Sequence, residues 1–340
     1  MKKLRVFLFV SLLIALVGTW GFLSPVVNRS SQKHFFIHTG SGFSAVRDSL
    51  ISQHIISGGF WFTLLSKASG YDKRILPGRF DISEANNIFR LVRKLRSGMQ
   101  DPVRLTITKI RTRKDLAGKI AAKLENDSAE IICFLNNNDS LAALASDTNT
   151  VMSIIIPNTY LFLWNTNFKE VLKRLISQKN SFWNEQRRSL AAEKGLTPLQ
   201  AYILASIVEE ETNDQDDKGL IASVYLNRIA KGMKLEADPT VRFALGDFSI
   251  QRVLNGHLDI PSPYNTYRNS GLPPGPICTP SIRTIDAVLH APKTDYLFFA
   301  ASPKFDGSSS FAKDYAEHLK NAGKYRKALD SLLDTRKNIR

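Results

Sequence analysis

Hydrophobic residues form one charge-free stretch near the start of the chain and recur periodically after it. The 22 residues from Val6 to Val27 contain no charged side chain, and Lys2, Lys3 and Arg5 stand in front of them. A stretch of roughly 20 apolar residues can span a bilayer, and a basic flank favours an N-terminus in the cytoplasm. A cleaved signal peptide is the alternative, but no Ala-x-Ala site follows. The pattern therefore predicts an uncleaved anchor in residues 1–27.

Residues 35–100 have the spacings of a small α+β module, after a polar linker at residues 28–34. Glycine and proline separate their short apolar runs, as in strands and helices joined by turns. The predicted elements are a strand at Phe35–His38, helices at Phe43–Ile56 and Phe60–Ser69, a turn and strand at Leu76–Ile82, and a helix at Ile88–Leu95.

Residues 101–196 are interpreted as a connecting α+β region. Arg104–Ile110 alternates as a half-buried strand does, and Asp115–Leu124 has helical spacing. The rest indicates mostly helical pieces, with an asparagine-rich break at Asn136–Asp139 and a turn at Pro157–Tyr160.

The pattern is clearest in residues 197–335, which are expected to form a larger mixed α/β domain. Thr197 followed by Pro198 is typical of a helix start. The later elements are a helix at Asp214–Ala230, loops at Asp238–Thr240 and 264–280, a helix at Ile282–His290, a buried strand at Tyr296–Ala300 and a closing helix at Tyr315–Leu332. The chain as a whole is therefore predicted to be an α+β protein with an N-terminal membrane helix.

Three consecutive glutamates close the first helix of this domain. At about 100° per residue, apolar positions 199, 203, 204, 207 and 208 share one arc. Glu211 falls near its middle, whereas Glu209 lies opposite and Glu210 at the margin. Burial and the helix dipole both favour the protonated form of an inward carboxyl, which suits a general acid. The sequence predicts this role for Glu211; the alternative is a frayed, solvated helix end.

Composition excludes several kinds of partner. The formal net charge of +15 favours anionic polymers or lipid headgroups, but no recognisable nucleic-acid-binding module occurs, so we expect no nucleic-acid partner. No His-Glu-x-x-His or similar spacing is present, and we predict no metal and no cofactor. Cys133 and Cys278 are either two thiols or one disulfide.

The loop at residues 264–280 carries candidate substrate contacts. Tyr264, Asn265, Thr266 and Tyr267 supply hydroxyls, an amide and flat rings, which suit sugar hydroxyls and the apolar face of a sugar ring. Long irregular connections in a compact domain are often functional. A carbohydrate-binding wall is therefore expected, with a purely structural loop as the alternative.

Motifs across residues 205–311 together resemble those of the bacterial YceG-like family of endolytic murein transglycosylases. In order they are Ala205-Ser-Ile-Val-Glu-Glu-Glu-Thr212, Val224-Tyr-Leu-Asn-Arg228, Asp238-Pro-Thr-Val241, Tyr264-Asn-Thr-Tyr267 and Gly271-Leu-Pro-Pro-Gly275, followed by Thr279-Pro280, Ala291-x-Lys293-Thr294 and Tyr296-Leu-Phe-Phe299. Leu76-Pro-Gly-Arg-Phe80 resembles part of the family's LysM-like module.

The resemblance implies a lytic transglycosylase that cleaves the β-1,4 bond between N-acetylmuramic acid and N-acetylglucosamine in nascent glycan strands. The products would carry 1,6-anhydromuramoyl ends, and glycan elongation would stop. Glu211 would be catalytic, because the family's glutamate precedes the Thr of the helix motif. The candidates for substrate binding are Tyr264, Asn265, Thr266, Tyr267, Asp238, Thr240 and Asn227.

The implied partners are peptidoglycan glycan strands, the bacterial plasma membrane and, as candidates, peptidoglycan synthases of the elongation or division machinery. The catalytic domain would lie on the extracytoplasmic side. Glu210 departs from the family pattern at a position that is often basic. Two other functions stay open: a muramidase-type hydrolase, which would need a second carboxylate, and a non-catalytic cell-wall scaffold.

Overall fold

The computed structural model describes residues 3–9, 11, 19 and 33–337. Most of the predicted membrane anchor lies outside the described residues. In the described part of the chain, no helix combines the length and apolar character that a membrane crossing requires. Contacts divide the chain into two compact units. The first comprises residues 1–105, 120–126 and 161–168, and the second residues 106–119, 127–160 and 169–340.

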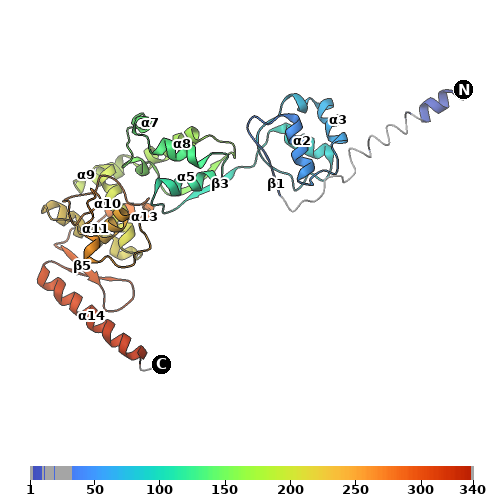
Figure 1. The fold of residues 1–340 in the computed structure, drawn as a ribbon. Coiled ribbons are helices and arrows are strands. Elements are labelled where there is room, and N and C mark those ends of the chain that lie inside the picture. Colours follow the sequence, from blue (N-terminus) through green and yellow to red (C-terminus); the bar gives the residue numbers. More distant parts are fainter. Residues whose placement is uncertain (1–2, 10, 12–18, 20–32, 338–340) are drawn as a thin grey trace. The chain divides into compact units, whose positions relative to one another are not determined.

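The first unit is built on a two-stranded antiparallel sheet (Figure 1). Phe35 stands opposite Phe80 in that sheet, and both side chains are fully buried. The elements are β1 (His34–Ile37), α2 (Phe43–Ser52), α3 (Phe60–Ser69), a 3-10 turn at Tyr71–Lys73, β2 (Gly78–Asp81) and α4 (Ile88–Ser97). The predicted order of strands and helices is confirmed. The first helix ends early because His54 adopts a left-handed backbone with φ of 54°.

Two later segments complete the first unit. The Glu125 carboxylate accepts a hydrogen bond from the Thr39 N–H at 2.9 Å, and His38 Nδ1 lies 2.8 Å from the same oxygen. The ring of Trp164 meets that of Phe36 with 5.0 Å between centroids. Residues far along the chain therefore close the base of a module that is mainly built from residues 33–105.

The second unit is rich in helices and has small sheets. Strands β5 (Phe298–Ala301) and β6 (Ser309–Ala312) pair within it, and β3 (Val103–Ile107) pairs with β4 (Asn158–Phe162), two strands whose residues are divided between the units. The helices are α5 (Arg113–Ala121), α6 (Ser128–Leu135), α7 (Asn138–Ala142), α8 (Phe168–Phe182), α9 (Glu185–Glu193), α10 (Pro198–Glu211), α11 (Gln215–Ala230), α12 (Asp238–Leu245), α13 (Ile282–Leu289) and α14 (Tyr315–Lys337), with 3-10 turns at Val151–Ile154 and Asn255–His257.

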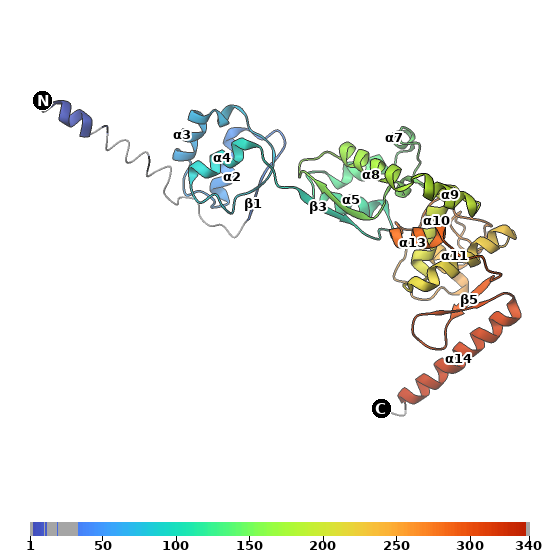
Figure 2. The same ribbon diagram turned by 180° about the vertical axis from the view of Figure 1, so that it is seen from behind.

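Helix α10 is the central element of the second unit. It packs against α11 and α13 (Figure 2), and every residue from Ala201 to Val208 is buried. The residues after β3 are tied to a distant loop, because the Ile110 N–H donates to Thr279 Oγ1 (2.9 Å) and the Thr279 N–H donates to the Ile110 carbonyl (2.8 Å). The segment after β3 and the loop before α13 are thus joined by two hydrogen bonds.

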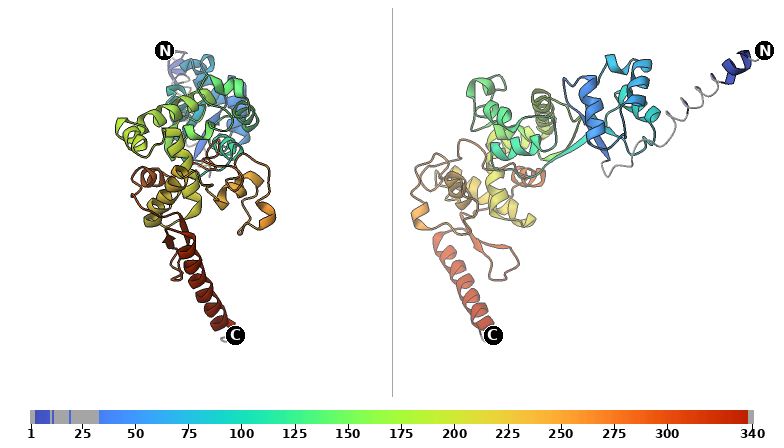
Figure 3. Two further views of the ribbon diagram at one scale, coloured as in Figure 1. Left: turned by 90° about the vertical axis from the view of Figure 1, so that its left-hand side faces the viewer. Right: turned by 45° about the vertical axis from the view of Figure 1, so that its right-hand side comes forward.

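Three predictions for this unit are wrong. Asp238–Thr240 opens helix α12 instead of a loop, because a proline fits the first turn of a helix. Pro157–Tyr160 leads into strand β4 instead of a turn. The strand predicted at residues 296–300 begins at Phe298 and is half-buried, because it pairs with the unpredicted β6 and α14 packs along the resulting hairpin (Figure 3).

Both cysteines are free thiols. Cys133 is exposed on α6, whereas Cys278 is buried. The Cys278 thiol donates to the Ser206 carbonyl of α10 at 3.4 Å, so it serves as packing for the central helix.

Candidate active site

The local sequence sets where α10 begins and ends. Thr197 caps the helix by accepting a hydrogen bond from the Gln200 N–H at 3.2 Å, and the Gln200 side chain returns a bond to the Thr197 N–H at 2.8 Å. This reciprocal pair is a capping box. At the other end Thr212 is in extended backbone. The three glutamates therefore occupy the last turn of a well-anchored helix.

Two of these glutamates are neutralised by lysine and arginine. Glu209 Oε2 lies 3.2 Å from Lys218 Nζ of α11 and accepts hydrogen bonds from the Ser281 and Thr284 hydroxyls. Glu210 is held from the segment after β3, since Arg111 donates two hydrogen bonds to its carboxylate at 3.0 and 2.8 Å. Burial opposes ionisation of Glu210, but the hydrogen bonds from Arg111 and the charges of Lys109 and Arg111 outweigh it and lower the pKa of Glu210.

Glu211 has a different environment. Its Oε1 accepts a hydrogen bond from the Tyr225 hydroxyl of α11 at 2.6 Å, and it has no ion pair among the described residues. Part of the residue stays accessible to solvent, yet desolvation of the carboxyl raises the pKa of Glu211 from 4.5 to about 7. The Tyr225 bond and the charge of Arg242 lower that pKa, and Asp238 raises it. At neutral pH this carboxyl can therefore hold a proton and release it.

Asp238 and Tyr267 lie beside Glu211. The Tyr267 hydroxyl donates to Asp238 Oδ1 at 2.7 Å. Burial raises the pKa of the Tyr267 hydroxyl, and the charges of Asp238 and Glu211 raise it further. Asp238, at the start of α12, and Tyr267, in a later loop, are thus brought together within electrostatic reach of the predicted acid.

Tyr264 packs against helix α12, which begins with Asp238. Its ring packs on Phe243 of α12 with 4.7 Å between centroids, and its hydroxyl donates to Asn149 Oδ1 at 3.3 Å. Burial raises the pKa of the Tyr264 hydroxyl to about 12. Gly275 closes the contact, because a Cβ there would stand 2.0 Å from the Asn149 carbonyl and 2.9 Å from the Tyr264 hydroxyl. The ring is therefore held in place from two sides.

Asn265 and Thr266 face inward and shape the loop. The Asn265 amide donates to the Leu258 and Ile260 carbonyls at 2.8 and 3.0 Å, and its oxygen accepts from the Tyr267 N–H at 3.0 Å. Both residues are buried. Their hydrogen bonds hold the turn that positions Tyr267. The structure therefore gives both residues a structural role in the loop.

Thr240 and Asn227 are also engaged inside the protein. The Thr240 and Thr266 hydroxyl oxygens lie 2.8 Å apart, and the Thr240 hydroxyl donates to the Ala237 carbonyl at 2.6 Å. The Asn227 amide donates to the carbonyls of residues 294 and 296 at 2.8 and 2.9 Å. The first pair joins α12 to the loop, and the second joins α11 to the segment before β5.

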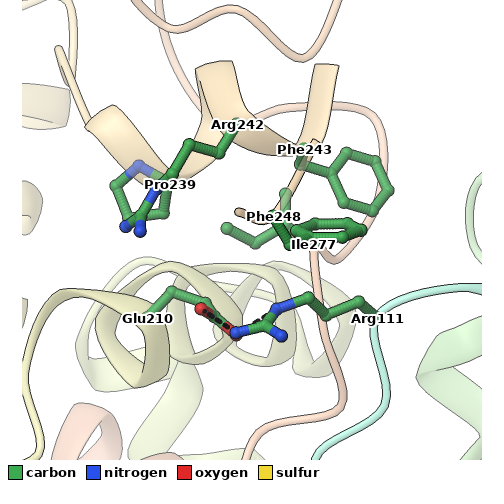
Figure 4. A pocket seen from close by; sticks show the side chains of 7 residues that line it. All are labelled: Arg111, Glu210, Pro239, Arg242, Phe243, Phe248 and Ile277. Carbon is green, nitrogen blue, oxygen red and sulfur yellow. Dashed lines mark hydrogen bonds and ion pairs between the residues drawn. The ribbon is translucent and has the colours of Figure 1, made fainter. Parts of the chain in front are cut away.

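A small pocket lies directly beside the acidic turn. Figure 4 shows its lining: Arg111, Glu210, Pro239, Arg242, Phe243, Phe248 and Ile277. The Arg111 guanidinium also stacks on the Phe248 ring at 5.0 Å. Within the described ranges, no group of three or more His, Cys, Asp or Glu side chains is placed to hold a metal ion. The chemistry available here is that of a carboxyl, phenolic hydroxyls, arginines and aromatic rings.

Tyr225 and Arg242 were not predicted as site residues. The helical spacing of residues 214–230 places Tyr225 on the inward side of that predicted helix, which accounts for its ring as part of the core. Nothing in the pattern showed that its hydroxyl would reach a carboxyl 14 residues earlier in the chain.

Comparisons with known proteins give one consistent family. The profile described as YceG-like family matches residues 35–324. A Bacillus subtilis (strain 168) protein named endolytic murein transglycosylase is 31% identical over 323 residues, covering 89% of this chain and 88% of that protein. A protein of the same name from Streptococcus pneumoniae serotype 2 is 27% identical over 175 residues, covering 50% of this chain and 31% of that protein. The crystal structure of a yceG-like protein from Listeria monocytogenes has a TM-score of 0.56 at 27% identity, covering 84% of this chain and 98% of that one.

Proposed function

Because this chain belongs to the YceG-like family, we propose that it is an endolytic murein transglycosylase with Glu211 as its catalytic acid and base. The single observation that carries this assignment is the Glu211 carboxyl at the end of α10, bonded to Tyr225 at 2.6 Å and with a pKa raised to about 7. A general acid works best when its pKa lies near the working pH.

In the proposed reaction the protonated Glu211 donates its proton to the oxygen of the glycosidic bond between N-acetylmuramic acid and N-acetylglucosamine. The bond from C1 to that oxygen breaks, and the C6 hydroxyl of the same muramoyl sugar forms a new bond to C1. The Glu211 carboxylate takes the proton of that hydroxyl, which restores the acid. The product is a 1,6-anhydromuramoyl end.

One carboxyl is sufficient for this sequence because the acceptor belongs to the substrate, which reduces the entropic barrier. A hydrolase would need a second carboxylate to activate or replace water. Glu209 is bound to Lys218 and to two hydroxyls, and Asp238 holds the Tyr267 hydroxyl. Because both carboxylates are already bonded to other side chains, neither is free to act as the second carboxylate of a muramidase, which favours the transglycosylase.

The proposal includes a location and substrate contacts. Residues 6–27 would anchor the protein in the bacterial plasma membrane, residues 35–100 would form a LysM-like module, and the second unit would act on nascent glycan strands outside the cytoplasm. Tyr264 and Tyr267 would contact the sugars near Glu211. Cleavage inside nascent strands would end their elongation beside the peptidoglycan synthases.

Digestion of purified murein sacculi by the full chain tests this proposal. We expect mass spectrometry to detect internal 1,6-anhydro products with the wild type and none with Glu211→Gln. Glu185→Gln is the matched control, because it makes the same chemical change at an exposed position on α9 and should keep full activity. Reducing ends in place of anhydro ends would establish a hydrolase. No cleavage by folded wild-type protein would favour a scaffold.

A further inference from the structure

Of the two arginines that line the pocket of Figure 4, Arg242 is the one that makes no ion pair with a described residue. Its side chain extends from α12 past Pro239 toward the acidic turn of α10. Glu210 is already saturated, because Arg111 binds it through two nitrogens and Lys109 Nζ lies 3.3 Å from it. Among the described residues, Arg242 makes neither an ion pair nor a side-chain hydrogen bond.

Protein structure alone does not account for this arginine. A partly buried charge without a partner is unfavourable, since its desolvation is not offset. Its charge also lowers the pKa of Glu211, which opposes the protonated state that an acid needs. A residue that is unfavourable for both stability and the resting acid is explained if a bound anion neutralises it.

The chemistry of the proposed substrate identifies that anion. The hydroxyl and acetamido groups of the glycan are neutral, whereas the peptide attached to the muramoyl sugar carries carboxylates. A guanidinium binds a carboxylate through two parallel hydrogen bonds. The Pro239 ring lies beside the Arg242 side chain (Figure 4) and would exclude water from one side of such a pair, which strengthens it.

Resting on the proposed function, we propose that Arg242 binds a carboxylate of the peptide stem and makes the site specific for peptide-bearing glycan strands. Binding would also remove the positive charge beside Glu211 and so favour its protonated form. Recognition of the stem and preparation of the acid would then be coupled.

Binding to full-length Glu211→Gln protein tests the inference without turnover. Calorimetry would compare peptide-bearing glycan fragments with the same fragments after an amidase has removed their peptides. We expect the intact fragments to bind about 10–100-fold more tightly, as for a hydrogen-bonded charged pair. Arg242→Met should abolish that difference, and Arg242→Lys should restore part of it. Arg252→Met, at an exposed position, should leave the difference intact.

Turnover of the wild type on the same two substrates supplies the second readout. We expect Arg242→Met to raise KM on peptide-bearing strands about tenfold or more, with little effect on stripped strands. Equal binding of both fragments, or equal losses on both substrates, would overturn the role of Arg242. If the role of Arg242 is overturned but anhydro ends are still formed, the transglycosylase assignment stands. If peptide-bearing fragments bind selectively but no anhydro ends are formed, the transglycosylase assignment is refuted and the role of Arg242 stands.

Discussion

The Glu211 carboxyl is less stable as an anion in the folded chain than in the unfolded one. Below pH 4.5 it is protonated in both states and adds no pH dependence. Between pH 4.5 and about 7 only the unfolded state ionises, so stability falls as the pH rises. Above pH 7 the loss is complete, on the order of 3 kcal/mol for a pKa difference of this size.

Glu211→Gln should therefore be more stable than the wild type at pH 8 by up to about 3 kcal/mol, because the amide carries no charge at any pH. The difference should vanish near pH 4. Chemical denaturation at both values measures it. A variant that is equally or less stable at pH 8 would contradict the raised pKa.

The Tyr225 hydroxyl is expected to tune the same carboxyl. Its hydrogen bond stabilises the Glu211 anion and lowers the pKa of Glu211, so Tyr225→Phe should raise that pKa. A general acid is lost as the pH rises through its pKa, and the alkaline limb of the kcat/KM profile should move up by about one pH unit. Movement toward acid would show that Tyr225 acts otherwise.

Residue roles at the site were only partly predictable. Glu211 could be identified because it follows an apolar run and stands in a family motif. The absence of an ion pair at Arg242 could not be predicted. It depends on Glu210 already being paired with Arg111, which lies 99 residues away in the sequence. The helical periodicity of residues 199–211 does not by itself single out Glu211. Leu199, on the apolar arc, is exposed, and the side chains of Glu209 and Glu210, off that arc, are largely shielded from solvent. Partners, more than burial, distinguish the three glutamates.

At the scale of elements, the start of α10 depends on its capping box. Thr197→Ala removes the acceptor for the Gln200 N–H and should lower the free energy of unfolding by about 1 kcal/mol. Thr197→Ser keeps the hydroxyl and should cost only a few tenths of that. Equal losses in the two variants, compared by thermal denaturation, would argue against the cap.

Local patterns predicted the elements whose own residues decide them. The cap at Thr197 and the regular spacing of residues 60–69 gave helix bounds that the structure confirms. Helix α12 was missed because Asp238-Pro239 reads as a turn unless the following residues continue as a helix. Strand β6 was missed because a four-residue strand is determined by its partner β5, and not by its own alternation.

At the scale of the whole molecule, the proposed anchor predicts how the protein fractionates. The full chain should stay with membranes through washes with high salt and alkaline carbonate, because about 20 buried apolar residues hold it. A chain lacking residues 1–29 should be released. Extraction of the full chain by carbonate would instead indicate peripheral attachment through its net charge of +15.

Each unit is assembled from separate segments of the chain, and the local sequence pattern does not predict which segments come together. Thr39 and Glu125 are 86 residues apart, and no spacing within either segment indicates that they meet. The motifs across residues 205–311 identified the family, whose profile covers residues 35–324, but motifs carry no information about which loop closes which core.

The paired hydrogen bonds between Ile110 and Thr279 have a consequence for the order of folding. The ribosome completes residue 110 long before residue 279, and the side of the core that holds Arg111 against Glu210 cannot close until both are available. Contacts this distant in sequence form late. A partly synthesised chain therefore lacks the bonds that hold this side of the core together, and the acidic turn of α10 is fully assembled only after residue 279 has been synthesised.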